Sequence, residues 1–153
     1  MNNNCEVNCE NTEENKSNRA YRQWVKFHIE AVNEGLKIRN ASLKWGKFHD
    51  PNNKDIPISP EDISKINIEK HDTAIIASSG KENTASGTEG VFYICDENED
   101  KIAAIYWDCP WSGSNKLTID KYNTKFAIEQ SPTMISSSGA IGDVNLKVSK
   151  IWA

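Results

Sequence analysis

The chain has 153 residues, of which 37% are apolar, so it has room for one domain with a single core of modest size. Its formal net charge of −4 argues against a general affinity for the phosphates of nucleic acids, and against charge alone as a way to bind anionic membranes. Any contact with a membrane or a ligand must therefore depend on a specific site.

The N-terminal segment is polar and carries no hydrophobic targeting sequence. Residues 1–18 are rich in Asn and Glu and contain one aliphatic residue, Val7. Such a segment cannot bury enough apolar surface to offset its ordering entropy, so we predict a disordered extension over residues 1–20 and a folded domain over residues 21–153. Without a signal peptide or an apolar run of about 20 residues, the protein is expected to be made as a soluble cytoplasmic product.

Alternating apolar residues predict short strands from the start of this domain. Residues 24–31 have apolar side chains at every second position, which leaves Trp24 on the opposite face. After a turn at Gly35, a second strand reaches Trp45. Residues 49–57 hold two prolines and several Asn and Asp residues, a composition that is typical of a loop.

The rest of the chain continues the pattern of short strands and dense turns. Ser59-Pro60 starts a single helical turn, and residues 65–69 return to alternation. The segments 91–95 and 102–107 form a hairpin across an acidic loop, and their apolar character on both faces places them in the middle of a sheet. Further strands are predicted at residues 73–77, 116–120, 125–129 and 144–149. The sequence therefore predicts an all-β fold, a single-domain antiparallel β-sandwich.

No pattern of residues is typical of a catalytic or metal site. His28, His49 and His71 are far apart in the sequence and none has a candidate nucleophile beside it. Residues 96–100 match the start of a calcium-binding loop, but Lys101 stands where that loop needs glycine. We predict a protein that is not an enzyme and uses no metal or cofactor, with a triad assembled by the fold left open as an alternative.

The four cysteines lack the spacing of a disulfide or zinc framework. Cys5 and Cys9 lie in the polar extension, whereas Cys95 and Cys109 lie in apolar, strand-like surroundings. We predict two exposed thiols and two buried, inert ones. Cross-linking of chains through Cys5 and Cys9 stays open.

The most distinctive feature is a group of aromatic residues. The segment Tyr106-Trp107-Asp108-Cys109-Pro110-Trp111 ends a predicted strand and enters a proline turn, so several rings lie near one edge of the sheet. The pattern favours neither core nor surface for Trp107, and it favours exposure for Trp111. Rings at such an edge can hold a quaternary ammonium or rest in the interfacial zone of a bilayer.

These residues resemble a known family. Trp45-Gly46-Lys47-Phe48-His49, the segment 106–111, Asn123-Thr124-Lys125-Phe126 and Ser138-Gly139-Ala140-Ile141-Gly142 occur in the order and spacing of the aegerolysins. The resemblance covers about residues 21–150. It implies a β-sandwich that binds membrane sphingolipids, either sphingomyelin with cholesterol or ceramide phosphoethanolamine. It also implies a cytolytic or insecticidal toxin that acts with a larger pore-forming partner protein.

The resemblance also suggests candidate site residues. By position it implies lipid contacts for five aromatic residues, to which we add three polar ones; the candidates are Trp24, Trp45, Ser86, Glu89, Tyr106, Trp107, Asp108 and Trp111. Some fungal aegerolysins carry Glu immediately before a Gly-Thr-x-Gly turn, where this chain has Ser86, with Glu89 inside the turn. The preferred headgroup, the target organism, the identity of the partner and the oligomeric state therefore stay open.

The sequence supports three further expectations. A carbohydrate-binding sandwich is the alternative function, because sugars also stack on exposed rings, although Asp108 and Asn115 are the only hydrogen-bonding residues noted near the cluster. No segment resembles a pore-lining hairpin, so we expect the protein alone to lyse membranes poorly. We expect it to be released or deposited in crystals and to act at the membrane of a target cell.

Overall fold

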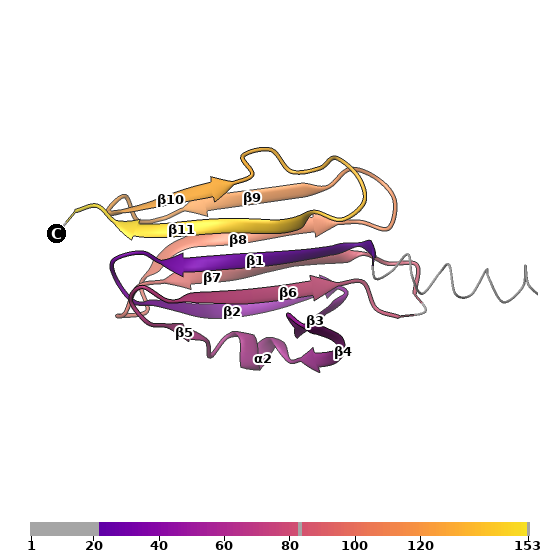
Figure 1. The fold of residues 1–153 in the computed structure, drawn as a ribbon, viewed down its shortest axis with the longest axis horizontal. Coiled ribbons are helices and arrows are strands. Elements are labelled where there is room, and N and C mark those ends of the chain that lie inside the picture. Colours follow the sequence, from indigo (N-terminus) through magenta and orange to yellow (C-terminus); the bar gives the residue numbers. More distant parts are fainter. Residues whose placement is uncertain (1–21, 83, 153) are drawn as a thin grey trace, which may run out of the picture.

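Two twisted β-sheets lie face to face in the computed structural model, which describes residues 22–82 and 84–152 (Figure 1). The elements in chain order are β1 (Trp24–Ala31), β2 (Leu36–Trp45), β3 (Lys47–Asp50), β4 (Asn53–Ile58), α2 (Pro60–Ile63), β5 (Asn67–Ile68), β6 (Thr73–Ser79), β7 (Thr88–Cys95), β8 (Lys101–Cys109), β9 (Lys116–Lys121), β10 (Phe126–Ser131) and β11 (Gly142–Lys150). The disorder predicted for residues 1–20 and the predictions for Cys5 and Cys9 lie outside the described residues.

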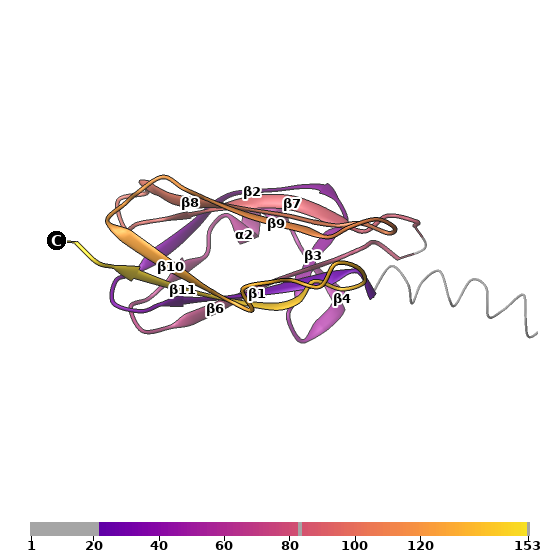
Figure 2. The same cartoon turned by 90° about the horizontal axis from the view of Figure 1, so that it is seen from above.

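The two sheets confirm the predicted sandwich. One has six strands in the order β10-β11-β1-β6-β3-β4, and the other has five in the order β5-β2-β7-β8-β9. Figure 2 shows the two layers edge-on. Among the described strands, β1 and β11 are the one parallel pair, and the other pairs are antiparallel. Within the described ranges, no helix is long and apolar enough to span a bilayer.

The core fills the space between the sheets with alternate residues of each strand. β1 buries every second residue and turns Trp24 outward, as predicted. Trp107 of β8 lies at the centre, where its ring packs against Phe27, Phe48 and Phe92 with centroids 5.4 to 5.9 Å apart. Aromatic pairs at such distances stabilise a core beyond the surface that they bury.

Residues 49–57 are not the predicted loop, because most of them belong to a hairpin. Strand β3 pairs with β6 and with β4, which forms the edge of the six-stranded sheet. From Asn53 to Pro57, every residue of β4 is exposed. A strand with no buried face carries no apolar alternation, so this part of the sequence gave no signal for a strand.

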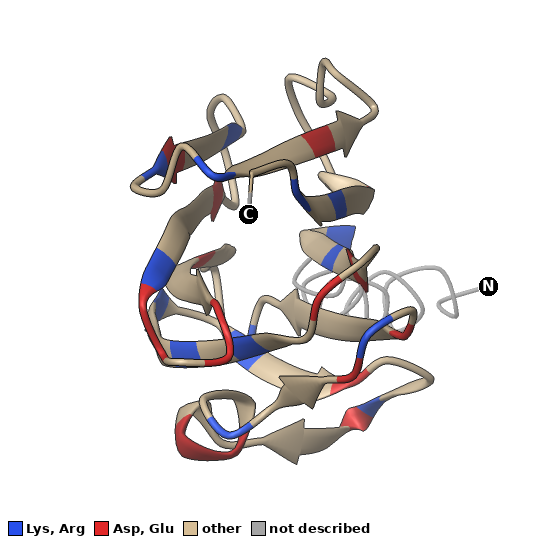
Figure 3. Ribbon diagram, turned by 90° about the vertical axis from the view of Figure 1, so that its left-hand side faces the viewer, with Lys and Arg blue, Asp and Glu red and all other residues tan. Residues whose placement is uncertain are grey.

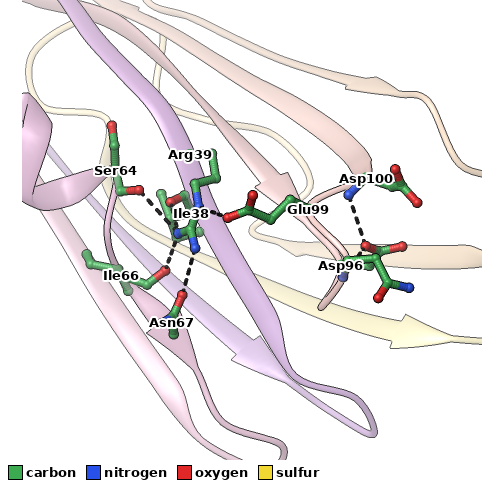
Figure 4. Close-up of polar contacts among 9 residues, drawn as sticks. Ile38, Arg39, Ser64, Ile66, Asn67, Asp96, Glu99 and Asp100 are labelled. Atoms are coloured by element: carbon green, nitrogen blue, oxygen red, sulfur yellow. Dashed lines mark hydrogen bonds and ion pairs between the residues drawn. The ribbon is translucent and has the colours of Figure 1, made fainter.

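The single helical turn is confirmed, and its cap is the predicted one. The Ser59 hydroxyl accepts a hydrogen bond from the backbone N–H of Asp62 at 3.1 Å, and Pro60 occupies the first helical position. Arg39 of β2 then holds the segment after α2 in place (Figure 4). Its guanidinium donates to Glu99 in the β7–β8 turn at 2.8 Å and to acceptors on Ser64, Ile66 and Asn67.

The two ends of the sandwich differ in character. The end that carries the β7–β8 turn mixes acidic and basic residues around its loops (Figure 3). The turn itself is the predicted acidic hairpin tip, and the Asp96 carboxylate accepts hydrogen bonds from the backbone N–H groups of Asn98 and Asp100. At the opposite end, β1 begins at Trp24, β2 ends at Trp45, and the loop after β8 carries Trp111.

Candidate functional site

A pocket of about 490 Å³ opens at the aromatic end of the five-stranded sheet. Its lining includes five of the residues that the sequence nominated, namely Trp45, Ser86, Glu89, Asp108 and Trp111. They come from the end of β2, the turn before β7, β7 itself, the end of β8 and the loop that follows β8. The fold therefore gathers most of the predicted site around one opening.

Strand register sets three of these side chains in a row across the sheet. Trp45 lies opposite Glu89, Glu89 lies opposite Asp108, and Lys116 of β9 continues the row. Cross-strand partners have Cβ atoms roughly 5 Å apart, so the ring and the two carboxylates are direct neighbours. The side chain of Trp45 is 55% exposed, which leaves a large apolar surface open beside two anionic groups.

Two glycines, Gly87 in the turn before β7 and Gly90 in β7 itself, allow this close arrangement. A Cβ atom on Gly87 would collide with the backbone carbonyl of Cys109, and one on Gly90 would lie 2.5 Å from the carbonyl oxygen of Ser42. Backbone atoms of paired strands cannot move aside as the end of a side chain can, so both positions require glycine. The turn consequently packs against β8, and β7 packs against β2, so Glu89 is held between the two neighbouring strands.

A chain of buried hydrogen bonds lies beneath the pocket and joins the two sheets. The indole Nε1–H of Trp107 donates to the Thr88 hydroxyl at 3.0 Å, and that oxygen lies 2.6 Å from the Ser78 hydroxyl. Ser78 donates its proton to the carbonyl oxygen of Lys47 at 2.8 Å, so Thr88 must donate to Ser78. Every donor in this series of hydrogen bonds has an acceptor, and the series fixes β7 and β8 over β6 and β3.

Replacement of Thr88 by valine tests this chain of hydrogen bonds. Valine keeps the shape of threonine but leaves the buried Trp107 N–H without an acceptor, so we expect the free energy of unfolding to fall by about 1–3 kcal/mol. Urea denaturation measures the change. The control is Thr118→Val on the exposed position of β9, which should alter stability far less. Equal effects of the two substitutions would contradict the role of Thr88.

Tyr106 lies beside the pocket and positions one of its carboxylates. Its hydroxyl donates to Oε2 of Glu89 at 2.5 Å, and this hydrogen bond, with smaller contributions from burial and from the charges of Glu89 and Asp108, raises the pKa of Tyr106 to about 12. Burial, followed by the negative charge of Glu89, raises the pKa of the Asp108 carboxyl, whereas Lys116 and Lys44 lower it. The two carboxylates therefore repel one another, and a bound cation would relieve that repulsion.

The raised pKa of Tyr106 predicts a stability change at alkaline pH. Because the folded protein holds this proton more tightly than the unfolded chain, the stabilisation is complete below pH ~10 and is lost as the pH rises towards about 12. Denaturation midpoints of the wild type should thus fall over this range relative to those of Tyr106→Phe. Parallel pH profiles of the two proteins would show that the hydrogen bond to Glu89 does not shift the pKa of Tyr106.

The loop that carries Trp111 is anchored by Gln23, a residue that sequence reasoning did not propose for the site. The buried side-chain amide of Gln23 donates to the carbonyl oxygens of Pro110 and Trp111 at 2.9 and 3.2 Å. Trp111 is half-buried, so the predicted exposure holds for only part of its side chain. No local pattern marks this role, because Gln23 lies 87 positions from Pro110 in the sequence.

Two nominated tryptophans do not belong to this pocket. Trp107 has no exposed surface, so this fold gives it no direct contact with a ligand, and its place is in the core. Strand alternation explains the difference, because β8 turns Tyr106 and Asp108 outward and turns Trp107 inward. Trp24 lies on the outer face of the other sheet, beside a separate pocket of about 390 Å³.

Comparison with known proteins identifies the fold. The family model described as Aegerolysin matches residues 22–151. The chain belongs to the aegerolysin family. It is 39% identical to Aegerolysin Aa-Pri1 of Cyclocybe aegerita over 88% of this chain and 94% of that protein. It is 36% identical to Asp-hemolysin of Aspergillus fumigatus over 86% of this chain and 95% of that one.

Solved structures agree with this assignment. IP-1A from Alcaligenes faecalis superposes with a TM-score of 0.82 at 40% identity, over 88% of this aegerolysin and 96% of that chain. The RahU protein, crystallised in complex with a TRIS molecule, superposes with a TM-score of 0.80 at 34% identity, over 86% and 97%. The predicted family and fold are thereby confirmed. None of these four names describes an enzyme.

Proposed function

We propose that this aegerolysin binds the headgroup of a membrane sphingolipid in the pocket between Trp45 and Trp111. The observation that carries the proposal is the row of one exposed indole and two adjacent carboxylates at the opening. The face of an indole attracts an ammonium group by cation–π interaction, and the carboxylates of Glu89 and Asp108 add direct charge attraction. Lys44 and Lys116 lie close enough to Asp108 to affect its pKa and can meet the phosphate of the same headgroup.

The relatives support this proposal in two ways. RahU was crystallised with TRIS, an amino alcohol that carries an ammonium group when protonated and so resembles the cationic end of choline or ethanolamine. Asp-hemolysin carries a name that denotes lysis of blood cells, which requires contact with a membrane. Both points favour a membrane lipid with a cationic headgroup as the ligand of this aegerolysin.

The shape of the molecule supports one orientation on a bilayer. Trp45, Trp111 and the pocket lie at one end of the sandwich, and charged loops surround the other end (Figure 3). Indole rings prefer the interface between headgroups and acyl chains, whereas charged loops remain in water. We infer that the aromatic end faces the membrane of a target cell.

The structure offers less to a sugar, the alternative ligand. Asn115, the amide noted beside the aromatic cluster, donates its side-chain N–H groups to the carbonyl oxygens of Ser136 and Gly139 and does not line the pocket. Asp108 is paired with a second carboxylate, an arrangement that favours a cation over a neutral hydroxyl. A glycan array tests the carbohydrate alternative directly.

Sedimentation with vesicles tests the proposed headgroup site. We expect the wild type to sediment with vesicles that contain sphingomyelin and cholesterol or ceramide phosphoethanolamine. Trp111→Ala should weaken the binding about tenfold, since a desolvated cation–π contact contributes roughly 1–2 kcal/mol.

The matched control is Trp152→Ala, which removes an indole that is 67% exposed outside the pocket, near the end of the last strand. This variant should bind as the wild type does. Equal losses in the two variants, or normal binding by Trp111→Ala, would place the lipid site elsewhere.

We further propose that a larger partner protein forms the pore and that this chain supplies the membrane recognition of a cytolytic or insecticidal toxin. Purified protein alone should release little dye from sphingolipid vesicles to which it binds. Rapid dye release without any partner would overturn this part of the proposal.

A further inference from the structure

The second pocket, on the outer face of the six-stranded sheet, has no role in the function proposed above. It lies between β1 and the β3–β4 hairpin, and its lining includes Trp24, Lys26, His49, Lys54 and Ser79. We propose that this pocket binds an oxyanion, the phosphate or sulfate group of a small molecule or of a lipid. The proposal does not depend on the headgroup site, because the two pockets lie on different sheets and share no lining residue.

Strand register brings the lining residues together. Trp24 lies opposite Ser79, which lies opposite Lys47 on β3. In the next row, Lys26 and His49 are both paired with Ala77 of β6. Trp24, Lys26 and His49 alternate with inward-facing core residues, so the outer face of β6 forms the floor of the pocket, and β1 and β3 form its sides.

The charge of the lining favours an anion although the whole chain is acidic. Lys26 and Lys54 contribute two ammonium groups, and Asp55 is the only carboxylate among the described residues that line the pocket. The Lys26 ammonium lies 5.6 Å from the centroid of the Trp24 ring, a contact that keeps this cation beside the opening. On a protein with a net charge of −4, such a site concentrates positive charge locally.

His49 can add a further positive charge when an anion is present. Its side chain is largely buried, and its Nδ1 donates to the carbonyl oxygen of Asp50 at 2.8 Å, so Nε2 carries a proton only in the imidazolium form. Burial lowers the pKa of His49, and the charges of Lys47 and Lys26 lower it further; the Asp50 carbonyl and carboxylate oppose them. Lys54, Asp55 and Ser79 complete the polar groups around the pocket. An oxyanion beside the ring would stabilise the imidazolium and raise this pKa.

Ser79 supplies a second, independent sign of a ligand. It is 2% exposed, and its hydroxyl has no hydrogen-bond partner among the described residues. Its neighbour Ser78 shows the usual arrangement, with its hydroxyl bonded to Thr88 and to the Lys47 carbonyl. Buried hydroxyls are nearly always satisfied, and one that is not, in the lining of a positively charged pocket, is a donor to which an oxyanion can bind.

Titration with inorganic phosphate, followed by NMR of the full chain, tests the proposal. We expect saturable shifts of the Lys26, His49 and Ser79 resonances and a rise in the pKa of His49 at saturation. Lys26→Gln and Ser79→Ala should each weaken phosphate binding about tenfold, or ~1.4 kcal/mol. Ser79→Ala should fold as stably as the wild type, because the hydroxyl that it removes has no partner.

Controls separate this site from the headgroup pocket. Lys125→Gln, an exposed lysine just before β10, should bind phosphate normally, and so should Trp111→Ala. A failure of Trp111→Ala to alter lipid binding would leave the phosphate result intact, so the two proposals can fail separately. The absence of saturable shifts, or an unchanged pKa of His49 with phosphate present, would overturn the oxyanion site.

Vesicles then distinguish the two sources of the anion. Phosphatidylcholine vesicles that also contain phosphatidic acid present a phosphomonoester at the membrane surface. If the wild type binds these vesicles more tightly than Lys26→Gln does, the oxyanion belongs to a lipid. If both proteins bind the vesicles equally while phosphate binding differs, the ligand is a soluble phosphate or sulfate ester. Both results support the site and assign its source.

Discussion

Replacement of Trp107 by alanine should lower the free energy of unfolding by about 3–5 kcal/mol, the cost of removing a large side chain from a well-packed core. The ring has no exposed surface and contacts three phenylalanines from β1, β3 and β7. Its loss would also leave the Thr88 hydroxyl without the indole donor. Folded domains are stable by only about 5–15 kcal/mol, so a loss of this size should lower the denaturation midpoint of the variant markedly.

Urea denaturation of Trp107→Ala and Trp45→Ala gives the comparison. The indole of Trp45 is 55% exposed, so its removal should change stability little while it weakens vesicle binding. For Trp107→Ala the expected result is the reverse, with a large loss of stability and normal binding by the fraction that remains folded. A stable Trp107→Ala protein that no longer binds lipid would show that Trp107 belongs to the lipid-binding site.

The sequence predicts the fold well where one face of a strand is buried. β1 and β11 alternate cleanly because one side packs on the core and the other meets solvent. β4 exposes nearly every residue, and no apolar pattern can mark such a strand. The failure at residues 49–57 therefore follows from the position of β4 at the edge of a sheet.

The apolar pattern also limits what the sequence reveals about single residues of the site. Trp107 was ambiguous because the residues around it in β8 are apolar at consecutive positions, which hides the face that points inward. The family resemblance nominated Trp45 and Trp111, to which Glu89 and Asp108 were added, and the fold places these four residues around one pocket. Gln23 lies 87 positions from Pro110, so only the tertiary structure reveals that its amide anchors that loop.

The double substitution Glu89→Gln and Asp108→Asn should weaken binding of sphingolipid vesicles by about a hundredfold. A hydrogen bond to a charged group contributes roughly 1.5–3 kcal/mol, so the loss of two such contacts to an ammonium approaches ~3 kcal/mol. The loss should be larger for ceramide phosphoethanolamine, whose ammonium has N–H groups to donate, than for sphingomyelin. Choline has no N–H group and depends on the indole face and on charge alone.

Stability provides the second measurement in this experiment. The amides relieve the repulsion between the two carboxylates but also replace the charged acceptor of the Tyr106 hydrogen bond, so the two effects oppose one another and the free energy of unfolding should change little. A matched control is Glu97→Gln with Asp100→Asn in the turn between β7 and β8, which removes the same charge at the opposite end of the sandwich. Because both variants change the net charge equally, a general electrostatic effect would weaken both alike. Equal binding by the two variants would therefore show that Glu89 and Asp108 do not recognise the headgroup.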